Sequence, residues 1–122
     1  MILCTPEMAQ AILDGRKTVT RRRWKRPRVK VGAIHQCYTR PAFARPPGKP
    51  FARVRIVSVL EERWCGAYAV PRIATLYAEA RREGFATWDD FEAAYTAING
   101  RPAMRQPCYR VEFRLEAEGS GP

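Results

Sequence analysis

The sequence has no long hydrophobic run. The chain of 122 residues is 46% hydrophobic, yet its longest apolar stretch, residues 54–60, is interrupted by Arg55 and Ser58. A membrane-spanning helix needs about 18 consecutive apolar residues, so we expect no transmembrane segment. The first residues, 1–7, lack the basic and long apolar regions of a secretory signal. We therefore expect a cytoplasmic protein that does not contact a membrane.

The sequence also has only one histidine and no cysteine motif. His35 is the single histidine, which excludes a histidine pair for ribonuclease chemistry and an HExxH metalloprotease motif. The four cysteines, at positions 4, 37, 65 and 108, form no CxxC motif and no Cys/His pair at zinc spacing. We expect reduced thiols, and neither a metal ion nor a cofactor.

Acidic residues are missing from one long segment. Residues 15–60 contain 14 basic residues and no acidic one, whereas the rest of the chain contains 8 basic and 12 acidic residues. The net charge of +10 therefore arises entirely in that segment. An arginine-rich composition would raise arginine everywhere, but it would not exclude carboxylates from one region. The asymmetry indicates a surface that binds RNA or a nucleotide.

Caps and apolar spacing predict three helices. Their boundaries are Thr5-Pro6 to Gly15, Pro71 to Gly84, and Thr87 to Asn99-Gly100. Alternating apolar residues predict strands over 18–20, 31–38, 51–60 and 109–115. A proline-rich stretch, Pro41–Pro50, is expected to be a surface loop beside the binding cleft.

The order of these elements shows no repeated βαβ unit. It predicts an α+β domain over residues 1–116, with a small mixed or antiparallel sheet curled toward a barrel and covered by helices. Residues 117–122 form a polar tail. Aromatic residues on apolar stripes are assigned to the core: Tyr77, Phe91, Tyr95, Tyr109 and Phe113. For Trp24 and Trp64, stacking against bases and partial burial under a loop are equally open.

The segment Gly15-Arg16-Lys17-Thr18-Val19-Thr20-Arg21-Arg22 contains a spaced motif. The pattern G-x-K-x-x-T-x-R resembles the signature of the ASCH domain, a family of the PUA-like superfamily. The resemblance extends to the N-terminal helix, a strand near Gly32 and the C-terminal strand. It implies a PUA-like β-barrel with a helical segment before its last strand, which binds RNA or nucleotides in a cleft beside the signature. We expect two helices in that segment and a monomeric protein.

Some small bacterial ASCH proteins hydrolyse N4-acetylcytidine with a lysine, a threonine and a glutamate. Lys17, Thr20 and Glu83 are the matching positions here. The resemblance implies that Thr20 is the nucleophile, Lys17 its base, and Glu83 the group that orients the amine or relays its proton. We expect the arginines around Lys17 to favour its neutral form. Glu83 is predicted in the last turn of a helix, where the dipole disfavours a carboxylate. Its position is explained either by a functional role or by neutralisation through a nearby arginine.

The basic residues around the signature are the predicted nucleic-acid contacts: Arg16, Arg21, Arg22, Arg23, Trp24 and Lys25. Three functions stay open. They are an RNA- or nucleotide-binding module, an amidohydrolase acting on an acylated nucleoside, and a metal-independent ribonuclease in which arginines stabilise phosphate charge. Thr20 favours the amidohydrolase, whereas the acid-free segment favours the two RNA-directed functions.

Overall fold

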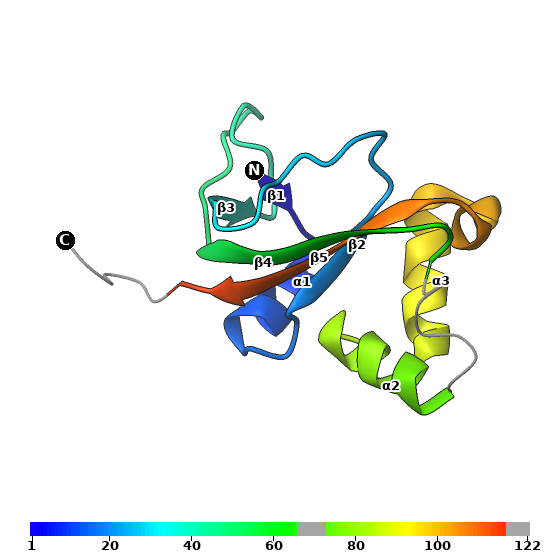
Figure 1. The fold of residues 1–122 in the computed structure, drawn as a ribbon. Coiled ribbons are helices and arrows are strands. Elements are labelled where there is room, and N and C mark those ends of the chain that lie inside the picture. Colours follow the sequence, from blue (N-terminus) through cyan, green and yellow to red (C-terminus); the bar gives the residue numbers. More distant parts are fainter. Residues whose placement is uncertain (66–72, 117–122) are drawn as a thin grey trace.

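Five strands and three α-helices make up the part of the chain that the computed structural model describes, residues 1–65 and 73–116 (Figure 1). In chain order the elements are β1 (Ile2–Leu3), α1 (Pro6–Leu13), β2 (Val19–Arg22), β3 (Ile34–Tyr38), β4 (Ala52–Glu62), α2 (Ile73–Arg82), α3 (Trp88–Asn99), a 3-10 helix η1 (Arg101–Arg105) and β5 (Cys108–Leu115). The predicted helix start at Pro71 and the predicted tail over 117–122 lie outside the described residues.

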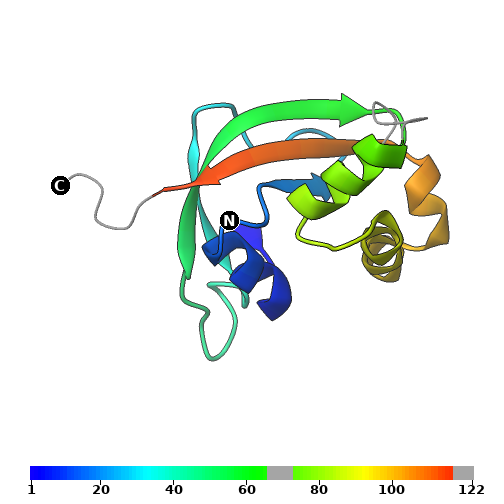
Figure 2. The same ribbon diagram turned by 90° about the horizontal axis from the view of Figure 1, so that it is seen from below.

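The strands form one mixed sheet in the order β1-β3-β4-β5-β2. β1 pairs parallel to β3, and the other neighbours are antiparallel. The edge strands β1 and β2 are not sheet neighbours, so the curled sheet is an incompletely closed barrel. In Figure 2 the helices α2 and α3 lie over one end of the β4–β5 pair, and α1 lies toward the other end. This confirms the predicted α+β class and the curled sheet.

The predicted helix caps form as expected. Thr5 Oγ1 accepts a hydrogen bond from the Met8 amide at 3.3 Å, and Thr87 Oγ1 accepts one from the Asp90 amide at 3.1 Å. Each cap satisfies an amide that has no partner within its helix. Gly15 follows α1 with a φ of +78°, a left-handed conformation that a side chain disfavours.

Three features differ from the sequence prediction. The strand expected from residue 31 begins at Ile34, because the chain first turns through Gly32, whose φ is +87°. The two-residue strand β1 and the helix η1 are not predicted. Both are too short for apolar periodicity to reveal them.

The proline-rich stretch 41–50 is a loop between β3 and β4, outside the sheet as predicted. The Arg40 side chain donates from Nε to the Pro46 carbonyl at 2.7 Å. At Gly48 a Cβ atom would overlap the Arg40 carbonyl oxygen, so the loop closes only with glycine there. No residue of the loop lines the cavity described below, but Thr39, two residues before the loop, does.

The buried apolar residues form two clusters. One lies within the curl of the sheet and includes Ile12, Ile56, Val111 and Phe113, and the other joins α2, α3, η1 and the start of β5. The core prediction is correct for Phe91, Tyr95 and Phe113, and Tyr109 is half-buried. It is wrong for Tyr77, which is 43% exposed, because α2 directs Glu79 and Ala80 inward instead.

Among the described residues, no helix combines the length and apolar character needed to cross a bilayer.

Candidate functional site

Lys17 is buried immediately after α1. The chain turns there because the amides of Arg16 and Lys17 both donate to the Ala11 carbonyl. Lys17 Nζ donates to the carbonyls of Val19 and Glu83, each at 2.8 Å, and to Glu83 Oε1 at 3.1 Å. Each of the three ammonium hydrogens thus has an acceptor, and the lysine connects the signature segment to the end of α2.

Burial lowers the pKa of Lys17 below its ordinary value of 10.5, since the charged form loses its hydration. The Glu83 carboxylate acts in the opposite direction without cancelling the shift, and Arg22 makes a smaller contribution that lowers the pKa. The sequence led us to expect that the surrounding arginines would lower the pKa of Lys17. Burial is instead the main cause of the lowered pKa.

Glu83 lies one residue beyond α2. Its amide donates to the Glu79 carbonyl at 3.0 Å, so the backbone still follows the helix, and Gly84 then reverses it with a φ of +95°. Glu83 Oε1 accepts from Lys17, and Oε2 accepts from Arg21 Nη1 at 2.8 Å. The cations that offset the unfavourable end of the helix dipole are therefore Lys17 and Arg21.

Thr20 is buried on β2, and its Oγ1 accepts a hydrogen bond from Arg22 Nε at 3.1 Å. Because the oxygen accepts in this bond, the hydroxyl proton stays available for another acceptor. Arg22 Nη2 also donates to the Leu3 carbonyl of β1 at 3.0 Å. The Arg22 side chain therefore bridges the two edge strands at the opening of the barrel, and Arg22 is half-buried rather than free on the surface.

A cavity of about 660 Å³ lies at this opening. Lys17, Thr20 and Glu83 line it together, so the structure brings the three matched positions to one site. The remaining walls come from the β1–α1 connection, the basic segment and α3. Its other lining residues include Leu3, Cys4, Met8, Arg22, Arg23, Trp24, Phe85, Phe91, Tyr95 and Ile98.

Arg21 is at the centre of a buried ion cluster that forms part of the cavity wall. Its side chain is 0% exposed, and it donates to Glu62 Oε1 at 2.8 Å, Glu79 Oε1 at 2.7 Å and Glu83 Oε2 at 2.8 Å. We define the buried ion cluster as three cations and three carboxylates: Lys17, Arg21, Arg110, Glu62, Glu79 and Glu83. Equal numbers of each charge make the cluster neutral, which is the condition under which buried ions are tolerated.

The sheet register explains why Arg21 and Arg110 need a shared carboxylate. The two residues are directly opposite each other on β2 and β5, where like charges repel. Glu79 Oε1 accepts from Arg21 Nη2 at 2.7 Å and from Arg110 Nε at 2.9 Å. Burial raises the pKa of the Glu79 carboxyl, but the hydrogen bonds and charges of the two guanidinium groups outweigh this effect and hold its pKa below the ordinary 4.5.

Arg21 is predicted from the sequence to contact nucleic acid, as part of the basic segment. The structure places its side chain in the interior, 0% exposed. The strand alternation of β2 turns it instead toward α2, where three carboxylates surround its guanidinium group. Arg21 is nevertheless one of the residues that line the cavity.

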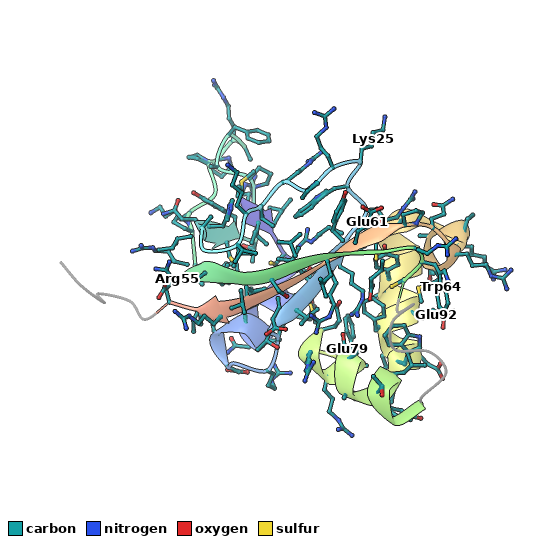
Figure 3. All side chains as sticks on the ribbon, in the orientation of Figure 1. Lys25, Arg55, Glu61, Trp64, Glu79 and Glu92 are labelled. Carbon is teal, nitrogen blue, oxygen red and sulfur yellow. The ribbon has the colours of Figure 1, made fainter. Side chains whose placement is uncertain are left out.

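The other predicted contacts lie at or near the surface. Arg16 is exposed and pairs with Asp14 at 3.1 Å. Arg23 and Lys25 are exposed, and Figure 3 shows Lys25 projecting away from the sheet. Trp24 is half-buried, lines the cavity and packs against Tyr109 with ring centroids 6.4 Å apart. Trp64 is 38% exposed and does not line the cavity.

Sequence reasoning missed Glu62, Glu79 and Arg110. One signal was available, because Glu79 and Glu83 are four residues apart and lie on the same face of a helix, where like charges repel. A buried cation between them removes that conflict. In Figure 3 Glu79 lies between α2 and the sheet.

Comparison with known proteins identifies the fold. No protein-family model matches the chain, and no curated protein matches it. Among solved structures, the ASCH protein of Zymomonas mobilis is 20% identical over 93% of this chain, with a TM-score of 0.57. The ASCH domain of Lactobacillus crispatus is 16% identical over 94% of this chain, with a TM-score of 0.62. The chain therefore has the fold of the ASCH domain structures.

The extent of the matches differs between these structures. This chain spans 64% of the Zymomonas mobilis protein and 77% of the Lactobacillus crispatus domain. It spans 96% of the hypothetical protein PH0355, with 14% identity and a TM-score of 0.63. At these identities the likeness concerns the fold, and the function is argued from the site.

Proposed function

We propose that this chain is an ASCH-family amidohydrolase that binds an acylated nucleoside, such as N4-acetylcytidine, in the cavity beside the signature. One observation carries the proposal. A buried Lys17–Glu83 ion pair, with Nζ and Oε1 3.1 Å apart, lines the same cavity as the Thr20 hydroxyl. A nucleophile, a base and a proton relay are the groups that amide hydrolysis requires.

The size and walls of the cavity suit a nucleoside. Its volume of about 660 Å³ falls within the roughly 300–1,000 Å³ typical of small-molecule sites. Trp24, Phe85 and Phe91 contribute aromatic rings to the wall, and such rings stack on bases. The guanidinium groups of Arg22 and Arg23 add hydrogen-bond donors for the polar edge of the ligand.

The proposed reaction moves one proton around this site. Carbonyls of Val19 and Glu83 hold two of the Lys17 hydrogens, so the third, which points to Glu83 Oε1, is the one that can leave. With Nζ neutral, the Thr20 hydroxyl gives its proton to Nζ as Oγ1 attacks the acyl carbon. Nζ passes a proton to Glu83 Oε1, 3.1 Å away, and Glu83 gives it to the departing amine as the C–N bond breaks. Water hydrolyses the resulting threonine ester, which releases the carboxylic acid and restores the hydroxyl.

The proposal is tested by incubating the purified chain with N4-acetylcytidine and following cytidine and acetate by chromatography. We expect equal amounts of both products and no need for an added metal ion. Single-stranded RNA incubated in parallel is expected to stay intact. RNA cleavage without deacetylation would replace this proposal with the ribonuclease alternative.

A second candidate function, binding of single-stranded RNA, is favoured by the exposed basic segment beside the cavity. Arg23 and Lys25 flank Trp24 there, and further exposed cations follow at Arg26, Arg28 and Lys30. Cations interleaved with an aromatic ring suit a single strand, which offers both phosphates and free bases. In that case the acylated cytidine would be a residue within an RNA rather than a free nucleoside.

If this segment binds RNA, the affinity is expected to fall with salt by about 0.7 log unit per log unit of salt for each neutralised phosphate. The double variant Arg23→Ala/Lys25→Ala should then bind more weakly, with a slope shallower by about 1.4. The measurement is fluorescence anisotropy with a labelled oligonucleotide at several salt concentrations.

The matched control is Arg101→Ala/Arg105→Ala, which removes the same charge from exposed positions of η1 that do not line the cavity. We expect this control to retain the slope of the unaltered chain. Equal slopes in all three proteins would contradict RNA binding through the basic segment.

A further inference from the structure

A glutamate at the end of β4 and a cysteine just after it lie close to a cysteine of β5 that is about 40 residues away in the sequence. Glu62, Cys65 and Cys108 are all buried, and their potential ligand atoms lie within 4.8 Å of one another. The end of β4 supplies Glu62, Cys65 follows three residues later, and Cys108 begins β5 opposite Glu62 in the sheet register. The Cys108 thiol donates to Glu62 Oε1 at 3.4 Å.

A fourth polar group faces this trio. The Tyr95 hydroxyl oxygen is buried, and it has no hydrogen-bond partner among the described residues. Tyr95 packs in the same cluster as Cys65 and Cys108. A buried hydroxyl without a hydrogen-bond partner destabilises the folded state. A metal ion bound to the Tyr95 oxygen would give this group a partner.

We propose that Glu62, Cys65 and Cys108, with the Tyr95 oxygen as fourth ligand, form a binding site for a zinc ion. Two thiolates with oxygen ligands are a donor set that zinc accepts in tetrahedral geometry. This site shares Tyr95 with the wall of the nucleoside cavity but includes none of the three proposed reacting groups, and it departs from the sequence-based expectation that no metal ion is bound.

The distances suit the ion. With Zn–S of about 2.3 Å and Zn–O of about 2.0 Å, a tetrahedral angle separates sulfur from oxygen by about 3.5 Å. The Cys108 sulfur and Glu62 Oε1 are already 3.4 Å apart. The ion would take the place of the thiol proton between these two atoms, and Cys65 would complete the set from within 4.8 Å.

The charge balance also allows the ion. Zinc binding releases the two thiol protons, so one doubly charged ion replaces two single positive charges and the interior net charge does not change. Arg21 Nε donates to Glu62 Oε1 at 2.8 Å, and its other nitrogens also contact Glu79 and Glu83. Glu62 therefore keeps a guanidinium partner while its carboxylate contributes to the metal site.

The experiment uses the full chain, purified with reductant and freed of metal with a chelator. It is titrated with zinc, and bound metal is measured by elemental analysis after gel filtration. We expect about one zinc ion per chain and a higher melting temperature in the presence of zinc. Cobalt in place of zinc should give thiolate-to-metal charge-transfer absorption, which falls to about half in a variant that lacks one of the two thiols.

The variants Cys65→Ser and Cys108→Ser are each expected to weaken zinc binding by at least about 10-fold, and Tyr95→Phe to weaken it less while leaving the cobalt–thiolate absorption in place. Cys37→Ser, a buried cysteine outside the trio, is the matched control and should bind like the unaltered chain. Circular dichroism of each metal-free variant separates loss of a ligand from loss of the fold.

Two results would overturn the proposal. One is no zinc retained by the folded, reduced chain, or equal retention by the Cys65→Ser and Cys37→Ser variants. The other is a Cys65–Cys108 disulfide, detected by mass spectrometry in protein purified without reductant, together with no metal uptake after reduction. Neither result bears on hydrolysis of the acylated nucleoside.

Discussion

Replacing Arg21 with methionine is expected to lower the free energy of unfolding by about 3–5 kcal/mol. The guanidinium group contacts Glu62, Glu79 and Glu83, and its removal leaves buried carboxylates with one cation fewer. The loss is measured by urea unfolding at neutral pH. Arg21→Lys should give an intermediate loss, because one ammonium group cannot reach all three carboxylates at once.

Arg16→Met is the matched control, since Arg16 is an exposed arginine of the same signature segment and pairs only at the surface with Asp14. Surface ion pairs contribute about 0–1 kcal/mol, so we expect little change. A loss below about 1 kcal/mol for Arg21→Met would show that the buried ion cluster does not hold α2 against the sheet.

Removal of either reacting group is expected to lower the rate of N4-acetylcytidine hydrolysis by at least about 100-fold. Thr20→Val keeps the shape of the side chain but removes the hydroxyl, and Lys17→Met removes the amine. RNA affinity should stay nearly unchanged in both variants, because the exposed cations of the basic segment are retained. The measurements are steady-state kinetics and anisotropy on the same preparations.

Thr18→Val is the matched control for Thr20→Val, because Thr18 does not line the cavity. It should retain the rate of the unaltered chain. A Thr20→Val protein that still hydrolyses the substrate at a comparable rate would remove Thr20 as the nucleophile.

The pH dependence of kcat/KM gives a second test of Lys17. The base must be neutral to accept the Thr20 proton, so kcat/KM is expected to rise with pH until Lys17 has lost its charge. Because burial lowers the pKa of Lys17, the midpoint of this rise should lie below the ordinary 10.5. A midpoint at or above that value would argue against Lys17 as the base.

Local features of the fold were predictable because they depend on neighbouring residues. The hydroxyls of Thr5 and Thr87 each accept a hydrogen bond from a backbone amide three residues later. The glycines with positive φ likewise turn the chain locally. The strand Cys108–Leu115 follows from its alternation. It correctly placed Val111 and Phe113 on a buried face. It did not show that Arg110, on the other face, is also buried, because the carboxylate that it contacts, Glu79, comes from α2.

The sequence by itself determined the α+β class and the charged segment, because caps, periodicity and charge are properties of short stretches. The positions Lys17, Thr20 and Glu83 were proposed from the resemblance to the ASCH family. Only the tertiary structure decided that Arg21 is buried against three carboxylates while Arg23 is exposed, and that Cys65 and Cys108 meet beside Glu62. The physical reason is the same in both cases. The partners are supplied by α2, β4 and β5, about 40 to 60 residues away from the groups they contact, and no local pattern records which distant strands and helices pack together.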